Sequence, residues 1–213
     1  DTHVYVAAGT DGLHVVDVNN PGSISLEQTI LDEGSIQDVA VQDRFVFLST
    51  TSGLRVLQRL ADGLHPFGAI DVAGATVLEV LGDRAFMALT GTNELAVLDI
   101  SDPSKPKVIY KWRIEDQDLH LRNGGMDVKH FKWNGRYYFV QSLQFGQGGP
   151  DSDMGAVIVD VTDLPDPTKV KEVARLREPD SPGGFHNIFV YKHSSGRVLL
   201  IATIGAPYAA VYD

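Results

Sequence analysis

The feature that most constrains this chain is a short, mostly apolar segment that recurs along it and ends in Asp or Gln. The first three copies are spaced by 41 residues, the fourth follows after 61 and the fifth after 53. The copies are residues 13–17, 54–58, 95–99, 156–160 and 209–213. A second register repeats the interval of 41, with Tyr5, Val46 and Met87 in equivalent places. Because a fixed period of this size marks an array of similar units, the chain is predicted to be built from repeats.

Each repeat contains four short segments rich in β-branched and aromatic residues, which favour strands. In the second repeat they are residues 36–41, 44–49, 53–58 and 65–72. Turn-forming residues separate them, and no window of 11 residues shows the 3.6-residue period of a helix. Four strands in a unit of about 40 residues predict an all-β fold, a β-propeller of four-stranded antiparallel blades. An antiparallel sandwich is the alternative, and the constant spacing disfavours it.

The strands of a blade are named a to d from the innermost to the outermost. We expect one domain, with partial blades at both ends and about four and a half blades in all. The expected blades are residues 1–34 (partial), 35–73, 74–114, 125–177 and 185–213 (partial). The first expected strand is a b strand and the last is a c strand, so this domain is interpreted as an incomplete part of a larger propeller. The alternative is that a second chain supplies the missing strands.

Composition excludes several kinds of protein. Hydrophobic residues make up 43% of the chain, which is enough for a core and excludes a disordered protein. Eighteen Lys and Arg against 28 Asp and Glu give a net charge of −10, which argues against nucleic acid as a partner. Cys is absent, which excludes disulfides and thiolate metal sites. No apolar run approaches 18 residues, so we expect no membrane insertion.

Three of the recurring segments resemble a known repeat. GLHVVDVNNP at residues 12–21 and ELAVLDISDPSKP at residues 94–106 are similar to the LVIVD repeat of bacterial and archaeal secreted or surface proteins. Residues 157–163 resemble it too, whereas the second copy departs from it because Gln58 replaces the Asp. The resemblance implies a propeller located outside the cytoplasm, which means extracellular, at the cell surface or periplasmic. It implies little about activity.

The Asp that closes the recurring segment has a structural explanation. A carboxylate at the end of a strand can accept hydrogen bonds from backbone N–H groups of the following turn, and a nearby Pro fixes the next corner. We therefore assign a structural role to Asp17, Asp99, Asp160 and Asp213.

Three long connections are the candidate functional loops. They are residues 114–126, 143–154 and 177–185, and they account for the stretched intervals late in the chain. All three join strands at the end of the blades where strand a begins, which is called the top face here. Long loops on a rigid β scaffold commonly carry function, so any ligand or partner is expected at the top face of blades 4 and 5. The alternative is that these loops only pack against another blade or chain. The opposite, bottom face has two-residue hairpins, which leave little room for a site.

Side chains in and beside these loops include metal-ligand types. Two alternatives are open, a calcium site that uses the carboxylates and a transition-metal site that uses the imidazoles. The candidate metal ligands are His120, His186, Asp127, Asp151 and Asp153. No HxH or HExxH motif supports either site.

The inner strands carry polar residues in matching places. Aligning the four a strands brings together Asp38, Glu79, Asp127 and Asn187, which would form an arc near the top of the central channel. Together with His120 and His186 they are the candidate residues for a ligand or partner. Carboxylates that converge repel one another unless something compensates them. The alternative interpretation is that each bonds backbone groups of the adjoining blade.

No catalytic motif selects a reaction. There is no Gly-x-Ser-x-Gly elbow and no phosphate-binding glycine loop. The leading hypothesis is a binding or structural interaction module outside the cytoplasm, whose partner is a protein or the remainder of the propeller. The alternative is a metal-dependent enzyme with its site under the three long loops. It would use a divalent ion, either calcium or a transition metal.

Overall fold

The computed structural model describes residues 2–31, 34–92, 94–114, 124–145, 152–180, 183–205 and 209–213. These residues are nearly all strand and turn, and their one helix is the short 3-10 segment Pro167–Lys169. No helix among them is long and apolar enough to cross a membrane. The chain divides into two compact units, residues 1–85 with 99–107 (unit 1) and residues 86–98 with 108–213 (unit 2). Each unit is described by itself.

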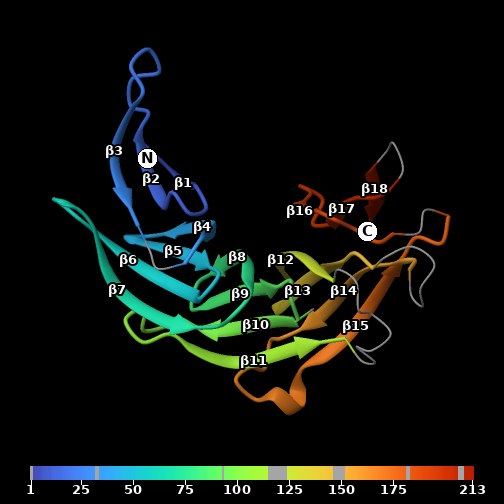
Figure 1. The fold of residues 1–213 in the computed structure, drawn as a ribbon. Coiled ribbons are helices and arrows are strands. Elements are labelled where there is room, and N and C mark those ends of the chain that lie inside the picture. Colours follow the sequence, from blue (N-terminus) through green and yellow to red (C-terminus); the bar gives the residue numbers. More distant parts are fainter. Residues whose placement is uncertain are drawn as a thin grey trace. The chain divides into compact units, whose positions relative to one another are not determined.

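The strands form five antiparallel sheets in chain order (Figure 1). The first, of three strands, is β1 (His3–Ala7), β2 (Leu13–Asp17) and β3 (Ser25–Ile30). The second is β4 (Ile36–Gln42), β5 (Phe45–Thr50), β6 (Gly53–Leu60) and β7 (Gly63–Asp71). The third is β8 (Ala75–Leu81), β9 (Arg84–Leu89), β10 (Glu94–Asp99) and β11 (Lys107–Arg113).

The remaining two sheets belong to unit 2. The fourth is β12 (Gly125–Trp133), β13 (Arg136–Leu143), β14 (Met154–Asp160) and β15 (Lys171–Arg177). The fifth, of three strands, is β16 (Ile188–Lys192), β17 (Val198–Thr203) and β18 (Ala209–Tyr212). In every sheet, strands that are consecutive in sequence are neighbours, which is the meander that short hairpins produce.

The second sheet confirms the predicted arrangement of four strands. Asp38 lies on β4 at one edge of the sheet, and Phe67 and Ile70 lie on β7 at the other edge. The outer hairpin is tighter than the sequence suggested, because β6 and β7 pair as far as Leu60 and Gly63. Gly63 has a φ of +124°, a conformation that glycine adopts without steric cost. Pairing therefore continues to the two residues of the turn itself.

Alternate residues of the strands build the core. In unit 1, side chains of the first two sheets form one buried cluster. It contains Leu13, Val15, Ile36, Val46, Leu48, Leu57 and Leu64. Successive side chains of a strand point to opposite faces, so a strand with apolar residues at every second position presents one continuous apolar face. This packing holds neighbouring sheets together.

In unit 2, aromatic rings pack around the fourth sheet. Phe139 is fully buried, and its ring centroid lies 6.3 Å from that of Phe86 and 6.2 Å from that of Trp112. Aromatic pairs at such separations stabilise a core beyond the area that they bury. The face of the sheet that carries Phe139 is therefore well filled.

The Asp at the end of the recurring segment has the predicted structural role in three copies. Its Oδ1 accepts a hydrogen bond from the N–H two residues later. The pairs are Asp17 with Asn19 (2.8 Å), Asp99 with Ser101 (2.9 Å) and Asp160 with Thr162 (3.0 Å). Asp213 instead accepts from Nε of Arg197 at 2.7 Å. Each of the first three carboxylates therefore ends its strand by forming an Asx turn.

Candidate functional site

The bases of the three long loops form one hydrogen-bonded layer at the top ends of the fourth and fifth sheets. We call it the loop platform and define it as residues 124–125, 143–145, 152–154, 177–178 and 183–187. Gln144 N donates to Gly124 O at 3.0 Å, which joins the first loop to the second. Phe185 N donates to Leu143 O at 2.9 Å, and Gly183 N donates to Ser152 O at 2.6 Å. The three loops are therefore linked where they leave the sheets.

The platform rests on buried apolar side chains. Phe145, Met154 and Phe185 are all at most 3% exposed. The ring of Phe185 packs so closely on Gly155 that a Cβ there would lie 2.3 Å from it. Gly184 has a φ of +74°, and a Cβ at this position would meet Leu143 O at 2.1 Å. Both positions therefore require glycine, and the close approach fixes the third loop against the second.

His186 is the exposed imidazole of the platform. Its Nδ1 lies 2.9 Å from Oε1 of Gln144, and its backbone carbonyl accepts from Oγ of Ser142 at 3.2 Å. With Gln144 accepting through oxygen, Nδ1 carries the proton and Nε2 is the acceptor nitrogen of the neutral ring. The side chain thus offers an oriented hydrogen-bond acceptor at the surface. This is a group that a partner could use.

The inner-strand carboxylates bond backbone groups of the next sheet, as the alternative interpretation held. In unit 1, Oδ2 of Asp38 accepts from the N–H of Leu78 on β8 at 2.9 Å. In unit 2, Oδ2 of Asp127 accepts from the N–H of Ile188 on β16 at 3.0 Å, and Oδ1 accepts from Lys129 Nζ at 2.9 Å. Asp127 is 5% exposed, so its charge is compensated inside the protein. Both carboxylates connect one inner strand to the next.

The same bonds change the alignment at the third sheet. Leu78 and Ile188 donate equivalent bonds, so these two residues correspond, and Val77 rather than Glu79 corresponds to Asn187. Glu79 lies two residues further along β8 and is partly buried. Asn187 is exposed, and its backbone N–H donates to Oγ1 of Thr203 at 2.9 Å. The fixed interval of 41 thus misplaces one member of the predicted arc.

The five residues predicted as metal ligands do not share one environment. His120 and Asp151 lie outside the described residues. Asp153 is paired with Arg177, whose NH1 lies 2.6 Å from its Oδ1, and Asp127 is paired with Lys129. Among the described ranges, no three His, Asp or Glu side chains lie together as a metal site would require.

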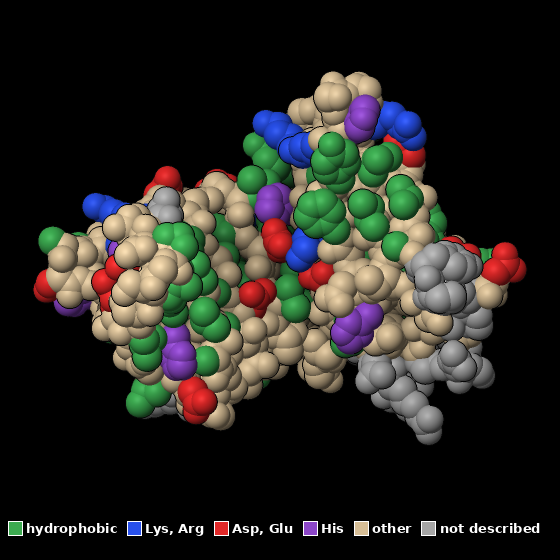
Figure 2. Space-filling view, turned by 90° about the horizontal axis from the view of Figure 1, so that it is seen from above, with side chains coloured by type: hydrophobic (Ala, Val, Ile, Leu, Met, Phe, Trp, Pro, Cys, Tyr) green, Lys and Arg blue, Asp and Glu red, His purple; other side chains and the backbone are tan. Residues whose placement is uncertain are grey.

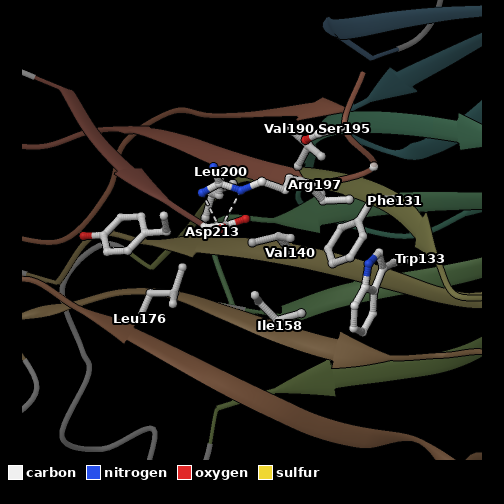
Figure 3. Close-up of a pocket in the computed structure, with 13 residues that line it drawn as sticks. Phe131, Trp133, Val140, Ile158, Leu176, Val190, Ser195, Arg197, Leu200 and Asp213 are labelled. Atoms are coloured by element: carbon white, nitrogen blue, oxygen red, sulfur yellow. Dashed lines mark hydrogen bonds and ion pairs between the residues drawn. The ribbon is translucent and has the colours of Figure 1, made fainter. Parts of the chain in front are cut away.

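A second feature of unit 2 was missed by sequence reasoning. It is an apolar cleft of about 520 Å³, lined by side chains of the fourth and fifth sheets (Figure 3). Short bottom hairpins were expected to leave little room for a site, but most of the residues that line this cleft lie on the strands of the two sheets, and hairpin residues 195–197 complete the lining. The one available signal was Trp133, a large aromatic residue directly before the turn residues Asn134 and Gly135. It is 49% exposed.

Charge is dispersed over the surface. Figure 2 shows acidic side chains spread among hydrophobic and neutral ones over the face that it draws. On the described part of that face they form no single acidic patch.

Comparisons with known proteins agree with this architecture. The family model of the LVIVD repeat matches residues 2–32 and 74–112. These two ranges contain the first and third recurring segments, and residues 157–163 lie outside them. Among curated proteins, none matches the chain.

Solved structures similar to this chain are longer than it is. A protein from Lactobacillus plantarum is 13% identical with a TM-score of 0.74, over 99% of this chain and 63% of that one. A functionally unknown protein from Desulfotomaculum acetoxidans is 11% identical with a TM-score of 0.65, over 98% and 66%. The β-propeller domain of Cps50 (Swd1) from Myceliophteria thermophila is 8% identical with a TM-score of 0.66, over 100% and 66%.

At these identities the likeness establishes the fold alone. This chain spans less than two thirds of the length of the Lactobacillus plantarum protein and about two thirds of the other two. Three four-stranded and two three-stranded antiparallel sheets fit a partial propeller. The chain is therefore a β-propeller protein that carries LVIVD repeats.

Proposed function

We propose that this protein is a binding and structural interaction module located outside the cytoplasm, and that a protein partner docks on the loop platform. The observation that carries the proposal is the linkage of three loops into one layer by the bonds Gln144–Gly124, Phe185–Leu143 and Gly183–Ser152. A partner that binds such a layer loses little entropy in ordering it, because the bases of the loops are already held in place.

Two properties of the platform favour recognition of a partner. His186 and Asn187 are exposed and adjacent, so they offer polar groups on one rigid turn. Arg177 and Asp153 of the same loop platform form an ion pair, which offers both signs of charge to a partner. Long loops on a rigid sheet are the usual place for such contacts. The location outside the cytoplasm is supported by the LVIVD repeats, which are typical of secreted and surface proteins.

Site-specific photocrosslinking tests this proposal. A photoreactive phenylalanine is placed at Asp180, an exposed residue of the third loop, and at Ser194, an exposed residue of the hairpin that joins β16 to β17. Both proteins are incubated with the envelope and secreted fractions of the source organism, and separately with its cytosol. We expect one discrete adduct from Asp180 with the envelope or secreted fraction and none from Ser194.

A loop deletion provides the second readout. Removing residues 147–150 from the Asp180 protein should abolish the adduct, because a partner that spans the platform also contacts the second loop. Equal adducts at both positions would contradict docking on the loop platform. An adduct that forms only with cytosol would contradict the proposed location.

A further inference from the structure

We propose that a cleft between the first sheet and the β6–β7 hairpin binds a neutral polyhydroxylated molecule of the size of a mono- or disaccharide. We call it the polar cleft. Its lining residues are His3, Tyr5, Val15, Glu27 and Gln28, together with residues 59–64. All of them belong to unit 1, whereas the loop platform belongs to unit 2, so this proposal goes beyond the proposed function and does not rest on it.

The polar cleft lies where the second repeat departs from the others. In the third repeat the recurring segment is followed by the loop SDPSKP, residues 101–106. This loop packs on β7 so closely that a Cβ at Gly68 would lie 2.1 Å from Pro103 O. In the second repeat Gln58 closes the segment, and a hairpin with a two-residue turn follows. This shorter connection lies beside the first sheet, and the polar cleft is the space between them.

The walls of the polar cleft are set by the first two sheets themselves. The hairpin is joined to β3 by the N–H of Leu64, which donates to Oε1 of Gln28 at 3.3 Å. β3 is one edge of the first sheet and β1 is the other. A further strand paired with β1 would extend this sheet in its own plane, beyond β1, and would leave the hairpin in place as the opposite wall.

The size and the floor of the polar cleft suit a small molecule. Its volume of about 640 Å³ falls within the range of ligand sites. Val15 and Leu64 line it and are at most 7% exposed, and both belong to the buried cluster of unit 1. Tyr5 packs against the same cluster. The polar cleft thus has a fixed apolar floor against which a sugar can place its C–H groups.

The charged side chains at the polar cleft already have partners inside the protein. The contacts are Glu27 with Nε2 of His3 (2.9 Å), Asp62 with Nε2 of His65 (2.9 Å), and Nη2 of Arg59 with Asp43 O (2.6 Å). An ionic ligand would have to compete with these contacts for the same groups. A neutral ligand leaves them in place, and it is therefore the better fit.

The lining also offers hydrogen bonds of both directions. The hydroxyl of Tyr5 can donate and accept, and the amide of Gln28 supplies an NH₂ group. The carboxylates of Glu27 and Asp62 have several lone pairs each and can accept more than one bond. A sugar hydroxyl is itself both donor and acceptor. A polyhydroxylated molecule therefore matches this lining better than an apolar one.

Methyl NMR titration of the full chain tests the proposal. The probes are D-glucose, D-galactose and N-acetyl-D-glucosamine, with acetate and methylammonium as charged comparisons. At least one sugar should shift the methyl signals of Val15, Leu60 and Leu64 in a saturable way. The signals of Val140, in the core of unit 2, should not move. Neither charged probe should give saturable shifts, because the charged groups of the polar cleft are already paired.

A pair of matched variants locates the binding. Tyr5→Phe removes one hydroxyl and keeps the ring, so it should weaken the affinity for that sugar about fivefold, the effect of one hydrogen bond. Tyr191→Phe makes the same change at a 46% exposed residue of unit 2 and should leave the affinity unchanged. Saturable shifts with none of the sugars, or with a charged probe alone, would overturn the proposal. So would equal affinity in the two variants, or shifts confined to methyl groups outside the polar cleft.

Discussion

The carboxylate of Asp127 accepts a hydrogen bond at 3.0 Å from the backbone N–H of Ile188, which lies 61 residues later in the chain. The bond joins β12 of the fourth sheet to β16 of the fifth. Asp38 makes the equivalent bond to Leu78, which joins β4 to β8. Inner strands of a propeller approach one another closely, and an aspartate there can satisfy a backbone N–H that has no partner within its own sheet. These carboxylates therefore serve the scaffold.

Gly155→Ala should destabilise unit 2 strongly. A Cβ at this position would lie 2.3 Å from the ring of Phe185, which is fully buried and cannot move away without disturbing the platform. Overpacking of this kind typically costs about 1–3 kcal/mol. Urea unfolding measures the free energy difference.

The matched control is Gly91→Ala. This glycine is exposed, and a Cβ there would meet no atom within 4 Å. Its substitution should change the free energy of unfolding by less than about 0.5 kcal/mol. A loss in Gly155→Ala as small as that in Gly91→Ala would contradict this and show that Phe185 yields to the added methyl group.

Asp160 should make stability depend on pH in acid. Burial alone would raise its pKa, but hydrogen bonds from Arg136 and Thr162 outweigh this and hold the pKa below its usual range. Because its pKa is lower in the folded state, the ionised carboxylate stabilises the fold at pH values above the unfolded-state pKa of about 3.9. This stabilisation is lost as the pH falls through the pKa of the folded state.

Comparison with Asp160→Asn isolates that contribution. At pH 7 the variant should be less stable because the ion pair with Arg136 is lost. The difference between the two proteins should stay constant from pH 7 to about pH 5 and shrink below about pH 4. Thermal unfolding across this range measures it. A stability difference that grows in acid would show that the folded state does not lower the pKa of Asp160.

The sequence predicted the sheets well because their signals are local. Alternating apolar residues, turn residues and a fixed interval all act within about 40 residues, so the four strands of the second sheet could be placed from residues 36–72 alone. The role of the closing carboxylate could be predicted for the same reason, since Asp99 bonds the N–H of Ser101 only two residues away. Local chemistry determines both features.

The site was harder to predict because its contacts are distant in sequence. Nothing local to Asp127 indicates that its partner is Ile188, and nothing local to His186 indicates Gln144. The alignment by a fixed interval of 41 treated Glu79 as equivalent to Asn187. In the structure Glu79 lies two residues further along β8 than Val77, which is the residue that corresponds to Asn187. The apolar cleft depends on the spacing of two sheets, which no residue pattern encodes directly.

Metal analysis separates the interaction module from the alternative of a metal-dependent enzyme. The interaction module needs no transition metal, so mass spectrometry of protein purified without chelators should find far less than one equivalent. One equivalent that is lost in His186→Ala with His120→Ala would contradict the proposed function and favour a metal site under the loops.

The most direct test of the whole account compares two variants, Asp127→Ala and His186→Ala, by urea unfolding. The account assigns Asp127 to the scaffold and His186 to the binding surface. Asp127→Ala leaves the N–H of Ile188 without its acceptor and should reduce the free energy of unfolding by about 2 kcal/mol. His186→Ala removes an exposed side chain and should change it by less than about 0.5 kcal/mol. An unchanged stability in Asp127→Ala, or an equal loss in His186→Ala, would contradict this division of roles.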